Sequence, residues 1–175
     1  MSTITVISGT NRPNSNTEVI ARFCEKLLQN EGLNVKFLSL QELPQSIAFT
    51  EMYGKRTPEF DTMINEYIEN TNKFLIVAPE YNGSFPGLLK TLIDAVHPKF
   101  WNHKKAGLIG VADGRAGNLR GIDQLTLILN YLKINVHHNK LPISQVTKLI
   151  DENRNLHDEL TQNVLAAYVK GLKEF

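Results

Sequence analysis

The sequence predicts an α/β protein in which a parallel sheet is covered by helices on both faces. Short apolar runs alternate along the chain with longer segments of helical periodicity, and no internal repeat or low-complexity linker interrupts them. This alternation fits a three-layer α/β/α sandwich around a five-stranded parallel sheet, for which 2-1-3-4-5 is a common strand order. At 175 residues the chain is long enough for one buried core and short for two. We therefore expect a single domain over residues 1–175.

Four apolar runs predict buried strands, and a fifth run is weaker. The four are Ile4–Ser8, Val35–Leu40, Phe74–Ala78 and Ala106–Ala112, and the weaker one is Asn135–Leu141. Apolar runs of this length are typical of strands that are covered on both faces of a parallel sheet.

Apolar residues at helical spacing predict five helices between and after these strands. The first, Thr17–Asn30, stops before Gly32, which suits a C-terminal cap. The second begins at Thr57-Pro58-Glu59, an N-cap followed by proline in the first turn, and its apolar face extends to Ile68. The remaining three helices are expected at 88–96, 119–132 and 156–172.

One long irregular stretch runs from Gln41 to Arg56, beside the end of the second strand. A loop of this length covers a ligand or a neighbouring subunit in some proteins and is an ordinary connection in others. The sequence favours neither interpretation.

The charge balance excludes partners that bind through a strong global field. Nineteen Lys and Arg stand against eighteen Asp and Glu, which gives a formal charge of +1, so we expect neither a nucleic acid nor a membrane partner. Met1-Ser2-Thr3 lacks the basic start of a signal segment, and no apolar run approaches the ~18 residues of a membrane span. A cytoplasmic location is therefore expected. The single cysteine, Cys24, falls on the apolar side of a predicted helix and is expected to be a buried thiol.

Ligands of open parallel sheets bind beyond the carboxyl ends of the strands. After the first strand, hydroxyl and amide side chains and one arginine precede a helix whose first N–H groups are unpaired. These residues are Thr10, Arg12, Ser15, Asn16 and Thr17. Their chemistry favours a phosphate site.

An alternative explanation of this loop is a capping box, because Ser15 and Glu18 have the Ser-x-x-Glu spacing of an ordinary helix start. Both explanations can hold together, but capping does not account for Arg12. The loop is neither a Walker A motif nor a GxGxxG fingerprint, since Gly9 is its only glycine. We therefore expect a ligand with one terminal phosphate.

Two further loops follow the third and fourth strands. The segment 79–87 carries two prolines and two glycines, which expose peptide groups, and its Tyr81 and Phe85 provide flat surface suited to a planar heterocycle. The segment 112–118 is a second glycine-bearing loop. Three such loops at neighbouring strand ends indicate one shared binding crevice.

Together these segments resemble the NADPH-dependent FMN reductases, a family of flavodoxin-like quinone and flavin reductases. The resemblance depends on Gly9-Thr10-Asn11-Arg12-Pro13-Asn14-Ser15-Asn16-Thr17, on Pro79-Glu80-Tyr81-Asn82 followed by Pro86, Leu89-Lys90 and Ile93-Asp94, and on Gly114-Arg115-Ala116-Gly117. The order and spacing match over almost the whole chain.

The resemblance implies that three groups of residues bind FMN. The phosphate group comprises Thr10, Arg12, Ser15, Asn16 and Thr17; the isoalloxazine and ribityl group comprises Pro79, Glu80, Tyr81, Asn82 and Gly83; and the ring's other side is bordered by Ala112, Asp113, Gly114, Arg115 and Gly117. Backbone near Asn82 and Gly83 would meet the pyrimidine edge of the flavin.

The implied activity is hydride transfer from NADPH or NADH to FMN, and then to a quinone, free flavin or similar small-molecule acceptor. No side chain is required as a nucleophile or base. The resemblance also implies a homodimer or homotetramer. Two alternatives remain: an FMN-binding electron carrier or sensor without turnover, which the +1 charge disfavours, and a flavin-free binding module.

Several residues depart from the family pattern or lie outside it. Thr91-Leu92 replaces Asn-Ala, which affects packing, and Asp113 and Arg115 place charges where flavin and substrate meet. We expect Asp113 to pair with Arg115 or with a neighbouring subunit. The five histidines lack metal-ligand spacing, and His137 and His138 would point to opposite faces of a strand. Trp101 is expected to pack in the core.

Overall fold

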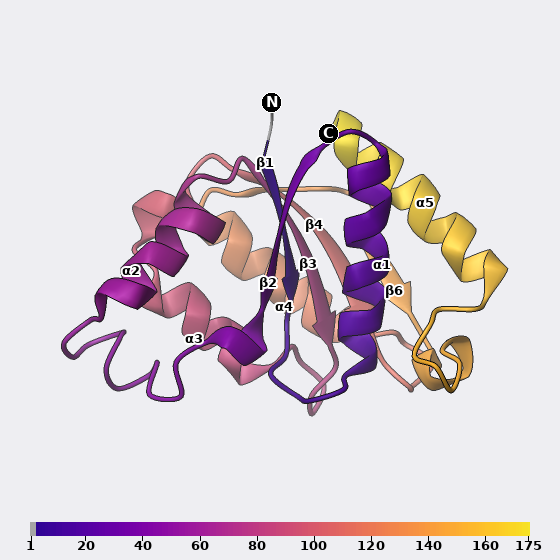
Figure 1. Ribbon diagram of the computed structural model, residues 1–175, viewed down its shortest axis with the longest axis horizontal. Coiled ribbons are helices and arrows are strands. Elements are labelled where there is room, and N and C mark those ends of the chain that lie inside the picture. Colours follow the sequence, from indigo (N-terminus) through magenta and orange to yellow (C-terminus); the bar gives the residue numbers. More distant parts are fainter. Residues whose placement is uncertain (1–2) are drawn as a thin grey trace.

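A parallel sheet forms the middle layer of the protein, between two layers of helices (Figure 1). The computed structural model describes residues 3–175. Met1 and Ser2, part of the segment that was expected to lack a signal sequence, lie outside the described residues. The strands follow the order β2-β1-β3-β4-β5, and β6 also pairs with β4. The predicted fold class and strand order are confirmed.

The predicted elements agree with the observed ones to within a residue or two, except near the second helix, the fifth strand and the fifth helix. The strands are β1 (Thr3–Ser8), β2 (Asn34–Ser39), β3 (Lys73–Pro79), β4 (Lys105–Val111), β5 (Asn135–Val136) and β6 (Leu141–Ile143). The α-helices are α1 (Asn16–Asn30), α2 (Pro58–Ile64), α3 (Gly87–Ala95), α4 (Leu119–Tyr131) and α5 (Glu159–Glu174).

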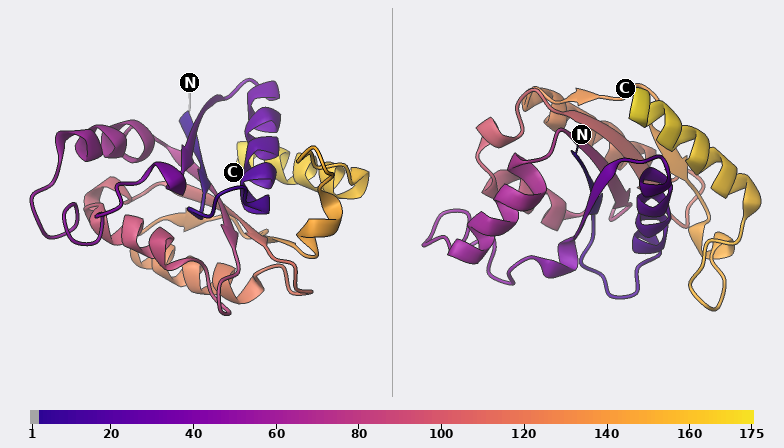
Figure 2. Two further views of the ribbon diagram at one scale, coloured as in Figure 1. Left: turned by 60° about the horizontal axis from the view of Figure 1, so that its bottom comes forward. Right: turned by 45° about the horizontal axis from the view of Figure 1, so that its top comes forward.

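The two faces of the sheet carry separate hydrophobic clusters because side chains alternate along each strand. In β1, Ile4 and Val6 pack with the residues of α1 and α5, whereas Ile7 packs with those of α2, α3 and α4. In β3, Leu75 faces the first pair of helices and Phe74 faces the second group. Figure 2 shows the two helical layers on opposite sides of the sheet.

The predicted fifth helix differs from the observed one at its start, whereas the second has the predicted extent but changes type along its length. The second is capped as predicted, since Thr57 Oγ1 accepts a hydrogen bond from the N–H of Phe60 at 3.3 Å, but it continues past α2 as a π-helical turn, η2 (Asn65–Glu69). The fifth starts later than predicted because Asp158 is its N-cap and accepts from the N–H of Thr161 at 2.8 Å. No helix of residues 3–175 is long and apolar enough to cross a membrane.

The predicted strand Asn135–Leu141 is wrong as one element, because β5 ends at Val136 and β6 starts at Leu141. At the break, the N–H of Asn139 donates to Nδ1 of His137 at 3.2 Å, a local bond that competes with the sheet ladder. The rings of His137 and His138 stack at 4.5 Å between centroids instead of pointing to opposite faces. The prediction failed for these two residues because it assumed a continuous strand.

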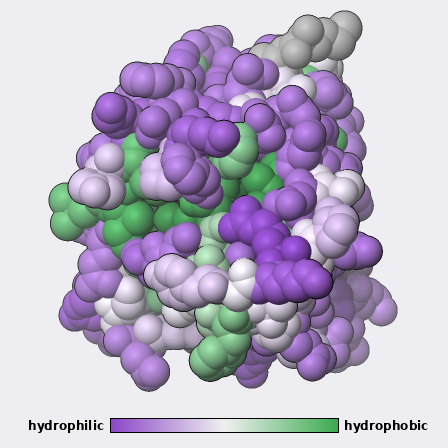
Figure 3. Space-filling model, turned by 90° about the vertical axis from the view of Figure 1, so that its left-hand side faces the viewer, coloured by the Kyte–Doolittle hydropathy of each residue, from purple (hydrophilic) through white to green (hydrophobic). Residues whose placement is uncertain are grey.

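The stretch predicted as irregular, residues 41–56, runs beside α2 and α3. Leu43 and Ile47 are buried in the cluster on that face, while Phe49 and Tyr53 are 85% and 87% exposed. Glu51 is buried and accepts hydrogen bonds from the N–H and hydroxyl of Thr57. Figure 3 shows a band of apolar side chains across this side of the molecule.

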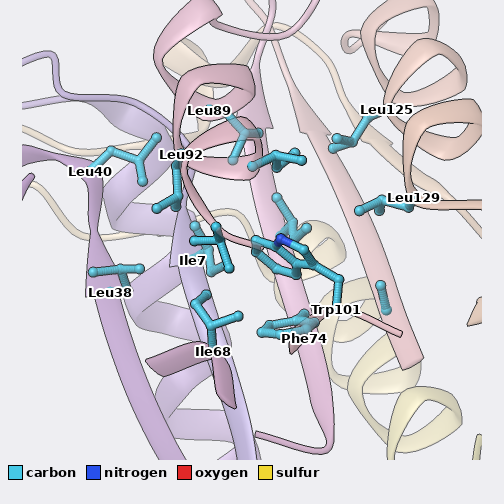
Figure 4. Close-up of a cluster of buried hydrophobic side chains, with 14 of the residues drawn as sticks. Ile7, Leu38, Leu40, Ile68, Phe74, Leu89, Leu92, Trp101, Leu125 and Leu129 are labelled. Carbon is cyan, nitrogen blue, oxygen red and sulfur yellow. The ribbon is translucent and has the colours of Figure 1, made fainter. Parts of the chain in front are cut away.

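Two residues expected in the interior are buried there. Trp101 is 1% exposed and packs on Phe74, with ring centroids 5.2 Å apart, among leucines of α3 and α4 (Figure 4). Cys24 on α1 is fully buried, and burial raises the pKa of its thiol to about 12. The prediction of a buried thiol is therefore confirmed.

Candidate functional site

One cleft lies at the carboxyl ends of β1, β3 and β4. These strand ends are at the lower edge of the sheet in Figure 1. Its volume is about 380 Å³. It brings together the three loops that the sequence singled out and adds a fourth segment, which follows β6. The lining residues are Arg12, Pro13, Asn14, Ser15, Asn16, Thr17, Pro79, Glu80, Tyr81, Val111, Ala112, Asp113, Val146 and Thr147.

The wall after β1 presents hydrogen-bond donors. Ser15 is the N-cap of α1, and its Oγ accepts a hydrogen bond from the N–H of Glu18 at 3.2 Å, as the capping-box spacing predicts. The N–H groups of Asn16 and Thr17, in the first turn, have no intrahelical acceptor by their position. Arg12 is exposed on the same wall. Two free amides and a guanidinium are the chemistry that binds a phosphate at a helix start.

Thr10 lies behind this wall and joins two loops. It is fully buried, and its Oγ1 is 2.7 Å from the hydroxyl oxygen of Tyr81. The same Oγ1 accepts a hydrogen bond from the N–H of Arg12 at 3.1 Å. Thr10 therefore fixes the loop after β1 against the loop after β3, and it does not line the cleft.

The loop after β3 is a tight hairpin turn. Tyr81 donates its N–H to the carbonyl of Ser84 at 2.8 Å, and Ser84 donates back at 3.1 Å. Asn82 and Gly83 form the tip with φ of 52° and 80°, the conformation that favours Asn-Gly in two-residue turns. Residues 79–81 line the cleft, and the tip lies just beyond it.

The loop after β4 carries a carboxylate that is held by a distant threonine. Oδ1 of Asp113 accepts hydrogen bonds from the N–H and the hydroxyl of Thr147, the former at 3.0 Å. These two bonds, with a smaller contribution from Arg12, hold the pKa of Asp113 below its usual value, so the carboxyl is ionised at neutral pH. The expected ion pair with Arg115 is not among those formed within residues 3–175.

The other residues of this loop that were expected to bind a cofactor do not line the cleft. Gly114 and Arg115 form its exposed tip. Gly117 has a φ of 54° and faces β6, where a Cβ added to it would lie 2.7 Å from Cβ of Pro142. This part of the loop therefore borders the cleft from outside.

Two residues that the sequence analysis did not single out shape the site. Thr147 follows β6 and donates to Asp113, and its hydroxyl also accepts from Nδ2 of Asn16 at 3.3 Å. Arg154 donates to Oδ1 of Asn16 at 2.8 Å. A polar residue shortly after the last strand could have pointed to Thr147 from the sequence. No sequence motif marks Arg154.

The fold defines a flavodoxin-like protein with a donor-lined cleft at the carboxyl edge of its sheet. The model of the family described as NADPH-dependent FMN reductase matches residues 2–148. The chain therefore belongs to the NADPH-dependent FMN reductase family, and it is an NAD(P)H-dependent oxidoreductase that uses FMN.

Known proteins similar to this chain include quinone reductases. It is 28% identical to a 2-hydroxy-1,4-benzoquinone reductase of a Burkholderia species over 171 residues, which cover 95% of this chain and 91% of that protein. It is 27% identical over 146 residues to an NAD(P)H:quinone oxidoreductase of Solanum tuberosum, with 81% and 75% covered.

A solved structure supports the three-layer fold. The flavoenzyme NAD(P)H:(acceptor) oxidoreductase FerB of Paracoccus denitrificans superimposes with a TM-score of 0.74 at 22% identity, and the match covers 99% of this chain and 98% of that one.

The donor set of the cleft fits FMN. The cofactor has one terminal phosphate, which matches the free amides of Asn16 and Thr17 beside Arg12. Beyond that wall, the cleft is bordered by Pro79, Glu80 and Tyr81 after β3 and by Val111, Ala112 and Asp113 after β4. These groups suit a flat, polar-edged ring better than a second phosphate.

Proposed function

We propose that this enzyme reduces quinones with NADPH or NADH and that FMN binds in the cleft at the ends of β1, β3 and β4. One observation carries this placement: the donor-rich start of α1 shares one cleft of about 380 Å³ with the loops after β3 and β4. When bound, FMN accepts a hydride from the nicotinamide and passes the electrons to the acceptor.

In this proposal each wall of the cleft has a separate task. Arg12, Ser15, Asn16 and Thr17 hold the phosphate, with Thr10 supporting them from behind. The segment 79–81 lies along the ribityl chain and ring, and the amides at Asn82 and Gly83 meet the pyrimidine edge. The loop that contains Ala112, Asp113, Gly114, Arg115 and Gly117 borders the open side where nicotinamide and acceptor exchange.

The choice of a quinone as acceptor is supported by the names of both relatives described above, which are a benzoquinone reductase and a quinone oxidoreductase. Quinones are flat, as is a free flavin, and both suit an open ring face. An electron carrier without turnover is disfavoured because the chain belongs to a reductase family and has no strongly acidic charge.

The test begins with absorbance of the purified protein after addition of FMN. Anaerobic titration with NADPH and with NADH should bleach the bound flavin band near ~450 nm, and the faster nucleotide identifies the donor. Steady-state oxidation of that nucleotide should then be faster with 1,4-benzoquinone than with free FMN. Absence of flavin binding by the folded protein would refute the placement, and bleaching without quinone turnover would favour the carrier.

We further propose that the enzyme is one domain and acts as a homodimer or homotetramer in the cytoplasm, where reduced nicotinamides are available. Support for assembly comes from α4, where Leu127 and Tyr131 are 71% and 85% exposed beside Ile93 and Val96 of the α3 region. Light scattering coupled to size-exclusion chromatography tests it, and a monomer at micromolar concentration would refute it.

A further inference from the structure

Arg154, in the hairpin before α5, contacts the loop after β1 from a hollow next to the cleft. Nη2 of Arg154 donates to the main-chain oxygens of Asn14 and Ser15 at 2.8 and 2.9 Å, and Nη1 donates to Oδ1 of Asn16 at 2.8 Å. Asn14, Ser15 and Asn16 line the cleft, whereas Arg154 lines a separate hollow next to it. The loop is therefore held between the cleft and the guanidinium.

These contacts fix the direction of the Asn14–Ser15 peptide and reinforce that of the Ser15–Asn16 peptide, whose carbonyl also begins the hydrogen bonding of α1. In a trans peptide the C=O and the following N–H point in opposite directions, and no cis peptide occurs in residues 3–175. Because the carbonyls of Asn14 and Ser15 point to Arg154, the N–H groups of Ser15 and Asn16 point away from it, toward the cleft. The reversed peptides would present oxygens to the cleft and repel an anion.

No carboxylate forms an ion pair with Arg154 within residues 3–175. All the contacts described above are made to neutral oxygens. Its positive potential therefore acts on the loop and, reduced by solvent screening because Arg154 is exposed, on any anion bound beyond it.

The hairpin that carries Arg154 is itself well fixed. Asp151 accepts a hydrogen bond from the N–H of Asn155 at 2.7 Å, which closes a tight turn in which Arg154 has a φ of 63°. Leu156 is buried in the cluster on the α1 and α5 face, and its carbonyl accepts from Gln162 of α5 at 2.7 Å. The backbone that carries the guanidinium is therefore held in place by these contacts.

We propose that Arg154 is a positioning residue for FMN binding. It holds the first loop in the conformation that directs the amides of Ser15 and Asn16 to the phosphate, and it adds positive potential there. The inference rests on the proposed placement of FMN and assigns a role to a residue beyond the family match, which ends at 148.

The test compares FMN with riboflavin, which has the same ring and no phosphate. Kd values are measured by quenching of flavin fluorescence for the wild-type protein, Arg154→Gln, Arg154→Lys and the control Lys26→Gln. Lys26 is an exposed lysine of α1 that lines the same hollow as Arg154, so its loss matches the change in charge. Arg154→Gln should weaken FMN binding about tenfold and riboflavin binding by less than about twofold.

The lysine variant should be intermediate, because an ammonium keeps the charge but lacks the planar fork that reaches two carbonyls. Lys26→Gln should change neither Kd by more than about twofold. Hydrogen exchange of the flavin-free protein gives a second measurement: the amides of residues 14–17 should exchange faster in Arg154→Gln, while thermal melting checks that the variant is folded.

Three outcomes separate the possible failures. Equal weakening of FMN and riboflavin by Arg154→Gln would overturn the inference, since it would show a general loss of structure. Unchanged FMN affinity in a folded variant would also overturn it and leave the proposed function intact. A wild-type protein that binds neither flavin would refute the proposed function, and the inference with it.

Discussion

The loops after β1 and β4 form two walls of one cleft but are built differently. The first is fixed at three places, by Thr10 against Tyr81, by Ser15 capping α1, and by Arg154 from behind. The second has two side-chain anchors, from Asp113 to Thr147 and from the buried Asn118, whose Nδ2 donates to the carbonyl of Ala78 at 2.9 Å, and its tip is exposed.

This difference matches the two partners that the walls would meet. The phosphate of a bound FMN is the same in every catalytic cycle. Donors that are already fixed in position bind it without losing conformational entropy. The nicotinamide and the acceptor enter and leave, and a less constrained, exposed loop suits partners that exchange. Substitutions in the loop after β1 should therefore have larger effects on FMN binding than similar substitutions in the loop after β4.

The largest effect is expected for Arg12→Gln. This exposed guanidinium is the cation that lines the cleft beside the free amides of α1, and a charge-assisted hydrogen bond to phosphate contributes about 1.5–3 kcal/mol. The Kd for FMN should rise roughly 100-fold, while that for riboflavin stays within about threefold. Fluorescence titration with both flavins measures this, and similar losses for both would contradict a phosphate role.

A smaller effect is expected for Thr10→Val, which breaks the link between two loops. Removing the buried hydroxyl leaves that of Tyr81 without its partner and should lower the free energy of unfolding by about 1–2 kcal/mol. FMN affinity should fall roughly fivefold, because the loop that carries Arg12 loses its support.

Thr5→Val is the matched control for that experiment. Thr5 is also fully buried, and its hydroxyl donates to the carbonyl of Tyr67 at 2.8 Å, but it lies in β1 away from the cleft. Urea unfolding should show a similar loss of stability with unchanged FMN affinity. If both variants weaken FMN equally, Thr10 has no specific role in the cleft.

Local patterns in the sequence predicted most of the fold and one wall of the site. The apolar runs of β1, β3 and β4 are long enough to identify without a partner, and the Ser15 cap is a contact between residues three apart. The broken fifth strand was not predictable in this way, because the side chain of His137 competes locally with a ladder that the pattern assumes.

Contacts between distant segments limited the prediction of the site. Arg154 and Asn16 are 138 residues apart in sequence, and Thr147 and Asp113 are 34 apart. Which long side chain reaches which loop depends on how α5 and its hairpin pack, and composition does not encode that. For the same reason, Thr10 looked like a phosphate ligand, although it lies behind the wall.

On the second wall, Asp113→Asn should have a modest effect of opposite sign on FMN affinity. Removing an ionised carboxylate beside the cleft should tighten FMN binding about threefold at low salt, and less at high salt because the group is exposed. Repeating the fluorescence titration at two ionic strengths checks this, and weaker binding in the variant would show that the bond to Thr147 matters more than the charge.

The same carboxyl predicts a pH dependence of stability. Its pKa in the folded protein is lowered from the ordinary 3.8 by the two hydrogen bonds from Thr147. Around and below pH 3.8 the unfolded chain therefore binds more protons at Asp113 than the folded one does. Asp113 thus stabilises the folded protein above pH 3.8, and this stabilisation is lost as the pH falls through the lowered pKa. Unfolding in urea at several acidic pH values should show a shallower decline for Asp113→Asn than for the wild-type protein.

The smallest effect is expected for Arg115→Gln, which repeats on the second wall the change made at Arg12. Arg115 is exposed at the loop tip and does not line the cleft, so its charge is screened by solvent. The Kd for FMN should stay within about twofold of the wild-type value. If Arg115→Gln instead weakens FMN as strongly as Arg12→Gln, the two walls hold the cofactor equally, and the difference between a fixed binding wall and an exposed exchange wall does not exist in solution.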